Sequence, residues 1–260
     1  MREYAKPDIS GSLRNLGLFC NEQLGRHMRS IHRSAALAAF IFVFFLTLTA
    51  APAQDRRQNE PGQFDFYVLA LSWSPSYCEA AIERTPGRIP DQCGERPYSF
   101  VVHGLWPQYE KGFPEYCQQQ PPRVDRATVS SMLDLMPSPR LIFNEWRKHG
   151  TCAGFSVGRY FQEIRKARAA VKIPQEYLDL ATTREVAPAD VEEAFLKANA
   201  GMTPGAISVA CDSKRVSEIR ICMTKDLQFR DCAEMERRSC KRSKLAMPAV
   251  RATRGQTSAQ

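Results

Sequence analysis

Runs of hydrophobic residues predict two buried strands early in the chain. Residues 64–72, FDFYVLALS, are aromatic and β-branched, carry little charge after Asp65 and are apolar on both faces, which is typical of a strand covered on both sides. Residues 98–102, YSFVV, form a second such run that ends at His103. We therefore expect His103 at the end of a buried strand, where a side chain is held rigidly.

Apolar residues at helical spacing predict four helices in the middle of the chain, and strand patterns follow them. The helices cover residues 125–135, 141–151, 158–171 and 189–200. The strands cover residues 206–211, 216–224 and 227–232, and the short polar turns between them favour hairpins. Stretches rich in proline and glycine at 83–97 and 108–123 predict loops.

The two ends of the chain differ from this middle part. Residues 35–50 form an uncharged apolar run of 16, preceded by arginines and followed by Ala51-Pro52-Ala53, which is the order of features in a cleavable signal peptide. A membrane anchor is the alternative, but the run is shorter than the roughly 20 residues that a spanning helix needs. We expect an N-terminal extension and signal peptide at 1–53, one domain at 54–240 and a basic disordered tail at 241–260. The protein is then exported, periplasmic or secreted, without stable membrane association once the signal is removed.

The cysteines agree with export. Nine are present, and one of them, Cys20, falls in the segment expected to be removed. An even set of eight in an exported chain predicts four disulfides, although eight cysteines allow roughly a hundred pairings. A zinc site is disfavoured because no CxxC pair occurs. The eight are Cys78, Cys93, Cys117, Cys152, Cys211, Cys222, Cys232 and Cys240.

Charge adds only a weak indication of the partner. The whole chain has a formal net charge of +8, and residues 54–260 keep 30 basic and 25 acidic side chains, a net charge of +5. A modestly basic surface suits a polyanion, but many exported proteins are basic.

The histidines give a stronger indication of chemistry. Of four histidines, His27 and His32 lie in the segment expected to be removed, which leaves His103 and His149. Each stands among chemically capable residues, in FVVHGLWP (100–107) and in NEWRKHGTC (144–152). Two imidazoles suit a reaction in which one group takes a proton and another gives one near neutral pH.

The second motif places more than a histidine on one helix face. If residues 141–151 are helical, Glu145, Lys148 and His149 share a face, while Trp146 points elsewhere and packs. The alternative is a solvated face with an ordinary Glu–Lys pair. Cleavage of RNA needs a base for the 2′-hydroxyl, an acid for the departing 5′-oxygen and a cation near the phosphate oxygens, and these residue types supply all three.

Both motifs resemble those of the ribonuclease T2 family. FVVHGLWP and EWRKHGTC are similar to its two conserved segments, and FDFYVLALSWSPSYC (64–78) resembles its N-terminal strand, so the resemblance covers about residues 64–240. It implies an α+β fold with a central antiparallel sheet flanked by helices and stabilised by disulfides. It also implies endonucleolytic cleavage of single-stranded RNA through a 2′,3′-cyclic phosphate, with low base specificity, no cofactor and no metal. We expect a monomer whose partner is its RNA substrate.

The resemblance also implies roles for individual residues. His103 would be the general acid and His149 the general base, and Glu145 and Lys148 would stabilise the transition state. Trp106 matches an aromatic wall for a base, although core packing after a strand is an equal alternative.

Two positions depart from the family pattern and bear on substrate binding. Asn144 stands where the family often has a histidine that contacts phosphate, so phosphate affinity is in doubt. Gln108 stands where some relatives have an acidic residue that contacts a base, which leaves base preference open.

The family suggests how the cysteines pair. Cys117 and Cys152 resemble its shared bridge, between the loop after the first motif and the end of the second. A local bridge Cys78–Cys93 and a nested arrangement, Cys211–Cys240 around Cys222–Cys232, complete the set.

Two other functions have to be weighed against an RNA-cleaving enzyme. His103, Glu145 and His149 could form a metal site of two histidines and a carboxylate, but the ammonium of Lys148 on the same face would repel a divalent cation. A catalytically silent RNA-binding or toxin-like module of the same fold is the other alternative, and Asn144 keeps it open.

Overall fold

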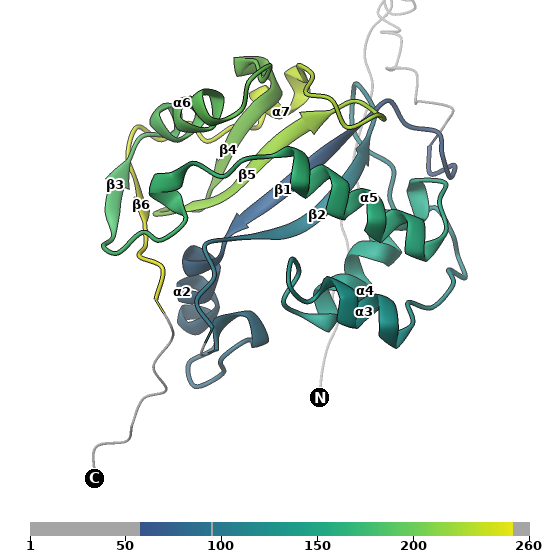
Figure 1. Cartoon of the computed structure of the whole chain (residues 1–260), viewed down its shortest axis with the longest axis horizontal. Helices are drawn as coiled ribbons and strands as arrows, with labels where there is room; N and C mark the ends of the chain where they lie inside the picture. Colours follow the sequence, from purple (N-terminus) through teal and green to yellow (C-terminus); the bar gives the residue numbers. More distant parts are fainter. Residues whose placement is uncertain (1–57, 95, 252–260) are drawn as a thin grey trace, which may run out of the picture. The chain divides into compact units, whose positions relative to one another are not determined.

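The first predicted strand forms one of two central strands in a four-stranded sheet. The computed structural model describes residues 58–94 and 96–251, which belong to one compact unit; the segment 1–53, expected to be a leader, lies outside them. The sheet is antiparallel throughout, in the order β2-β1-β5-β4 (Figure 1). A separate pair is formed by β3 and β6. The strands are β1 (Phe66–Trp73), β2 (Phe100–Gln108), β3 (Arg184–Val186), β4 (Ile207–Cys211), β5 (Val216–Met223) and β6 (Leu245–Met247).

Helices cover the sheet, so that β1 is buried on both faces as its composition predicts. Tyr67 and Leu69 belong to the main core, whereas Phe66 and Val68 face a smaller cluster on the other side. Helix α5 packs on β1 and β2, and α6 packs on β4 (Figure 1). The fold is therefore α+β with a central antiparallel sheet, as expected. The α-helices are α2 (Ser74–Arg84), α3 (Arg126–Met132), α4 (Pro139–Lys148), α5 (Val157–Ala170), α6 (Pro188–Ala198) and α7 (Ala233–Arg237).

The four predicted helices are present with similar bounds, but one of the predicted strands is not. Residues 227–232 form no regular strand, and only an isolated bridge joins Met223 to Phe229. The predicted turn is present, since Thr224 N–H donates to the carbonyl of Gln228 and Arg230 N–H donates to that of Cys222. The paired stretch stays short because β1 and β4 already flank β5 over most of its length. Little free edge is left for another strand.

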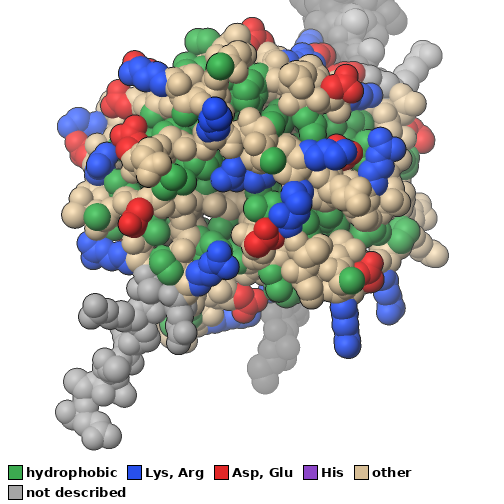
Figure 2. All heavy atoms as spheres, in the orientation of Figure 1, with side chains coloured by type: hydrophobic (Ala, Val, Ile, Leu, Met, Phe, Trp, Pro, Cys, Tyr) green, Lys and Arg blue, Asp and Glu red, His purple; other side chains and the backbone are tan. Residues whose placement is uncertain are grey.

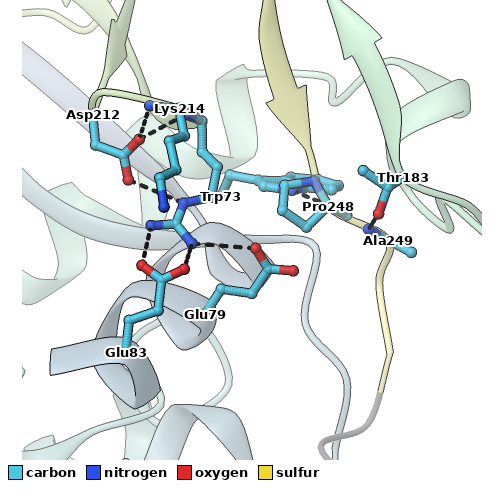
Figure 3. A network of polar contacts seen from close by, with 9 residues as sticks. Trp73, Glu79, Glu83, Thr183, Asp212, Lys214, Pro248 and Ala249 are labelled. Carbon is cyan, nitrogen blue, oxygen red and sulfur yellow. Dashed lines mark hydrogen bonds and ion pairs between the residues drawn. The ribbon is translucent and has the colours of Figure 1, made fainter. Parts of the chain in front are cut away.

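The prediction of a disordered tail from residue 241 is wrong for residues 241–251. Strand β6 pairs with β3, and Leu245 and Met247 are buried. The indole nitrogen of Trp73 donates to the carbonyl of Pro248 at 3.0 Å, and Ala249 N–H donates to the hydroxyl of Thr183 (Figure 3). A strand of three residues is too short to show an alternation of apolar and polar residues, so the sequence pattern could not predict β6. Residues 252–260 lie outside the described part.

A buried arginine fastens α2 to the hairpin of β4 and β5. The guanidinium of Arg215 lies 2.8 Å from Glu83, 3.3 Å from Glu79 and 3.1 Å from Asp212. Figure 3 shows the two glutamates projecting from α2 toward the turn that carries Asp212. The several hydrogen bonds compensate the guanidinium for the water that it loses on burial.

The four disulfides are those that the family resemblance implies. They join Cys78 to Cys93, Cys117 to Cys152, Cys211 to Cys240 and Cys222 to Cys232. The second holds the loop after β2 against the end of α4. Among the described residues, no helix is both long and apolar enough to cross a bilayer.

Candidate active site

His103 lies within β2, not at its end as expected. Ala70 pairs with Gly104 and Leu71 pairs with Val102, so His103 is the extra residue of a β-bulge. A bulge redirects a side chain out of the regular alternation of the strand. The fold thus holds His103 between paired residues and still leaves its side chain 39% exposed.

Gly104 allows the closest approach between β2 and α4. A Cβ atom at this position would overlap the carboxylate of Glu145 and the indole nitrogen of Trp106. Glycine is therefore required at this position, because any side chain would push Glu145 and Trp106 apart.

Helix α4 carries the second motif and is fixed at both ends. Ser138 caps its N-terminus with Pro139 as the first helical residue, and the helix ends at Lys148. Trp146 is buried, as predicted, and its indole nitrogen donates to the carbonyl of Pro122 at 2.8 Å. This packing turns the adjacent Glu145 toward β2.

Glu145 joins the two motifs. One of its carboxylate oxygens, Oε2, accepts a hydrogen bond from the indole nitrogen of Trp106 at 2.7 Å. The other, Oε1, lies 3.5 Å from Nε2 of His103. Burial raises the pKa of Glu145, and the charge of His103 and the bond from Trp106 only partly offset this. A carboxyl with a raised pKa can carry a proton and donate it in a hydrogen bond.

The indole of Trp106 contacts both imidazoles. Its ring centroid lies 5.2 Å from that of His103 and 5.3 Å from that of His149. The side chain is only partly buried. Core packing alone therefore does not describe Trp106, which is part of the site.

A residue that sequence reasoning missed supports His103 from another strand. Glu218 on β5 is 6% exposed, and its Oε1 lies 2.7 Å from Nδ1 of His103. Arg220 donates to the other oxygen at 2.8 Å, and Ser72 Oγ lies 3.4 Å from Oε1. The available signal was a charged pair, Glu218 and Arg220, at alternate positions of an otherwise apolar strand.

Glu218 determines how His103 holds its proton. Burial disfavours the charged imidazole, but the hydrogen bond and charge of Glu218, together with the charge of Glu145, outweigh it and raise the pKa of His103. The pKa of Glu218 is lowered: its burial is outweighed by His103 and Arg220. With Nδ1 bonded to Glu218, the nitrogen left to meet a substrate is Nε2, which lies 3.5 Å from Glu145.

The surroundings of His149 favour its neutral form. It follows the last residue of α4 and is buried. Burial, with the nearby positive charges of Lys148 and His103, lowers its pKa to about 3. Its Nδ1 atom has no hydrogen-bond partner within the described residues. His149 is therefore neutral over most of the pH range in which His103 is protonated.

The other three predicted site residues, Lys148, Asn144 and Gln108, lie in three different environments. The ammonium of Lys148 lies 3.5 Å from the carboxylate of Glu115 and 5.9 Å from the ring of Phe113, two residues that sequence reasoning did not select. Asn144 lines the cavity described below. Gln108 is buried at the end of β2, and its amide donates to the carbonyl of Pro107, so it presents no surface to a base.

A cavity of about 260 Å³ opens beside His103. Its walls include Asn144 and Arg140 from α4, Tyr77 from α2 and Ser72 from β1. No group of three or more His, Cys, Asp or Glu side chains in the described part of the chain has the arrangement of a metal site. The site is built from proton donors and acceptors, with cationic side chains beside them.

The chain is similar to known ribonucleases in sequence. The family model for the ribonuclease T2 family matches residues 64–232. A ribonuclease of Aeromonas hydrophila is 45% identical over 114 residues, which are 43% of this chain and 49% of that protein. A probable ribonuclease of Haemophilus influenzae is 35% identical over 131 residues, 46% of this chain and 48% of that protein. The chain thus spans about half the length of these two relatives.

Longer but weaker similarities extend over most of the chain. Ribonuclease I of Escherichia coli is 25% identical over 245 residues, which cover 76% of this chain and 88% of that protein. Among solved structures, an RNase-related protein from Calystegia sepium superposes with a TM-score of 0.57 at 24% identity, over 72% of this chain and 98% of the other. The structural likeness supports the fold, and the family match extends across both motifs. The chain belongs to the ribonuclease T2 family.

Proposed function

We propose that this protein is an endoribonuclease that cleaves single-stranded RNA by transphosphorylation, with His149 as the general base and His103 as the general acid. One observation carries the proposal: two imidazoles that contact the same indole have opposite protonation preferences. Pairs of titratable groups whose surroundings push their pKa values apart are the usual arrangement for acid–base catalysis.

The reaction is one concerted exchange at phosphorus. Neutral His149 takes the proton of the 2′-hydroxyl, and the 2′-oxygen forms a bond to the adjacent phosphorus. The bond from phosphorus to the 5′-oxygen of the next nucleotide breaks, and protonated His103 gives its proton to that oxygen. The products are a 2′,3′-cyclic phosphate and a free 5′-hydroxyl. Each proton transfer of this kind contributes roughly 10²–10⁴ in rate.

Three further groups are assigned to the charge that builds up on the phosphate oxygens. Lys148 is half-exposed and pairs with Glu115 across the surface, an interaction that solvent screens and a phosphate can displace. Glu145 lies 3.5 Å from Nε2 of His103, and the rise in its pKa favours the protonated carboxyl, the form that can donate a hydrogen bond to a phosphate oxygen. Asn144 contributes a neutral amide where a cation would bind phosphate more strongly.

The nucleotides on either side of the cleaved bond are assigned to different parts of the site. The leaving nucleotide lies in the cavity beside His103, because the general acid has to reach its 5′-oxygen. Trp106 and the exposed Phe113 lie near His149 and offer stacking surfaces for the base on the other side. Stacking accepts every base, which agrees with low base specificity.

A catalytically silent RNA-binding module is the second candidate, and Asn144 is the observation that favours it. The separated pKa values of the histidines argue for an enzyme, since binding alone does not require them. In this proposal the enzyme works as an exported monomer on RNA, without a metal or cofactor.

The ends of the products test the proposal. We expect the purified protein to cut a defined oligoribonucleotide into fragments with cyclic or 3′-phosphate and 5′-hydroxyl ends, equally well in EDTA. The same sequence made of DNA lacks the attacking hydroxyl and stays intact. Intact RNA would favour the binding module, and loss of cleavage in EDTA would favour a metal site.

A further inference from the structure

The cavity beside His103 continues into a second one. The second cavity, also about 260 Å³, lies between the end of α2, the loop that follows it and the start of α4. Tyr77, Ser138 and Arg140 line both cavities. Helices α2 and α4 lie below the sheet in Figure 1. Because the cavities share these walls, they adjoin each other, and the two together are called the groove.

The far part of the groove is basic. Arg84, Arg88 and Arg140 line it, and among the described lining residues the only carboxylate is that of Asp91. All three arginines are exposed, and no described residue forms an ion pair with them. The glutamates of α2, Glu79 and Glu83, are bound by Arg215. Positive charge is therefore left available in the groove.

The proposed chemistry gives the groove a direction. The general acid protonates the 5′-oxygen of the leaving nucleotide, so the cavity at His103 holds that nucleotide, and the groove beyond it leads toward the 3′ end of the substrate. We propose that the part of the groove lined by Arg84, Arg88 and Arg140 binds phosphates of RNA downstream of the leaving nucleotide. This inference rests on the proposed function. The exposed ring of Tyr77 offers a stacking surface between the two parts.

A substrate with one possible cleavage point tests the direction. Oligonucleotides with a single ribonucleotide are cut only after that ribose, because only it has a 2′-hydroxyl. One set carries one, two or three deoxynucleotides on the 3′ side, and a second set is extended on the 5′ side instead. We expect kcat/KM to rise with 3′ extension beyond the first deoxynucleotide.

The variant Arg84→Gln/Arg88→Gln removes two charges outside the catalytic site. We expect it to cleave the shortest substrate like wild type and to lose the gain from 3′ extension, roughly three- to tenfold for exposed charge contacts. Gains from 5′ extension should persist. Arg126→Gln/Arg242→Gln is the matched control, since these exposed arginines line neither cavity and the change in net charge is the same.

The salt dependence of binding affinity gives a second readout. It is measured with an all-DNA version of the longest 3′-extended substrate, which the enzyme cannot cut. Each phosphate contact to a single strand contributes about 0.7 to the slope of log affinity against log salt. The groove variant should lower that slope by about 1.4 relative to the control. Equal losses in the two variants, or an unchanged gain from 3′ extension, would overturn the inference. Failure of wild type to cut the shortest substrate would instead count against the proposed function.

Discussion

At the scale of single residues, the site depends on side chains that set each other's protonation. His103 and His149 are the same residue type, and their surroundings push their pKa values in opposite directions. Both histidines, Glu145 and Lys148 could be selected as candidates from the sequence, because the motifs that hold them are local. Glu218 could not be selected, because it is 115 positions from His103 and reaches it only through the pairing of strands.

The bond from Glu218 has a measurable effect on pH dependence. In the proposed mechanism His103 acts in its protonated form, so activity is expected to fall as pH rises through its pKa, which Glu218 raises. In Glu218→Gln that pKa drops, and the alkaline limb of the kcat/KM profile should move to lower pH. The limb due to His149 should remain near pH 3. The exposed Glu60→Gln is a control for loss of a carboxylate, and a Glu218→Gln profile that coincides with it would contradict this role.

The space at Gly104 gives a second test at this scale. Gly104→Ala forces Glu145 and Trp106 apart, so we expect a loss of about 1–3 kcal/mol in the free energy of unfolding, as for overpacked sites, together with lower kcat. Urea denaturation measures the first effect. Gly158→Ala, whose Cβ would meet nothing within 4 Å, is the control and should not lose stability. Equal stability of the two variants would show that the site tolerates a side chain.

At the scale of elements, periodicity predicted what is long and regular. The strand β1, helices α3 to α6 and the hairpin of β4 and β5 lie close to their predicted bounds. Helix α2 was not predicted, although it has a proline in its first turn, because SPSYCEAAIER holds few large apolar residues at helical spacing. The bulge at His103 and the strand β6 depend on pairing partners far away in the sequence, which no local pattern shows.

The buried strand β6 and the residues after it predict the effect of truncating the C-terminus. A chain that ends at Lys244 loses the buried side chains of Leu245 and Met247 and the bond from Trp73 to Pro248. We expect a loss of several kcal/mol, since each fully buried side chain contributes about 1.5–3 kcal/mol. Denaturant unfolding compares it with a chain that ends at Arg251, which keeps these contacts. If the two truncations are equally stable, β6 is dispensable.

At the scale of the whole molecule, net charge indicates little about where RNA binds. On the face in Figure 2, blue basic and red acidic side chains are interspersed. What distinguishes the proposed RNA path is the pair of adjoining cavities that runs from His103 past three arginines, which form no ion pair with any described residue. The sheet contributes to this path indirectly, because β2, β1 and β5 together hold His103 and Glu218 in register.

The most direct test of the central claim changes the leaving atom of the substrate. Replacing the bridging 5′-oxygen by sulfur gives a thiolate leaving group that needs no proton, because a thiol has a pKa of only about 8.5. His103→Ala and His149→Ala are assayed on the oxygen and sulfur substrates. We predict that both variants fail on the oxygen substrate, and that sulfur restores cleavage by His103→Ala but not by His149→Ala. Restoration of neither, or of His149→Ala alone, would contradict the assignment of acid and base.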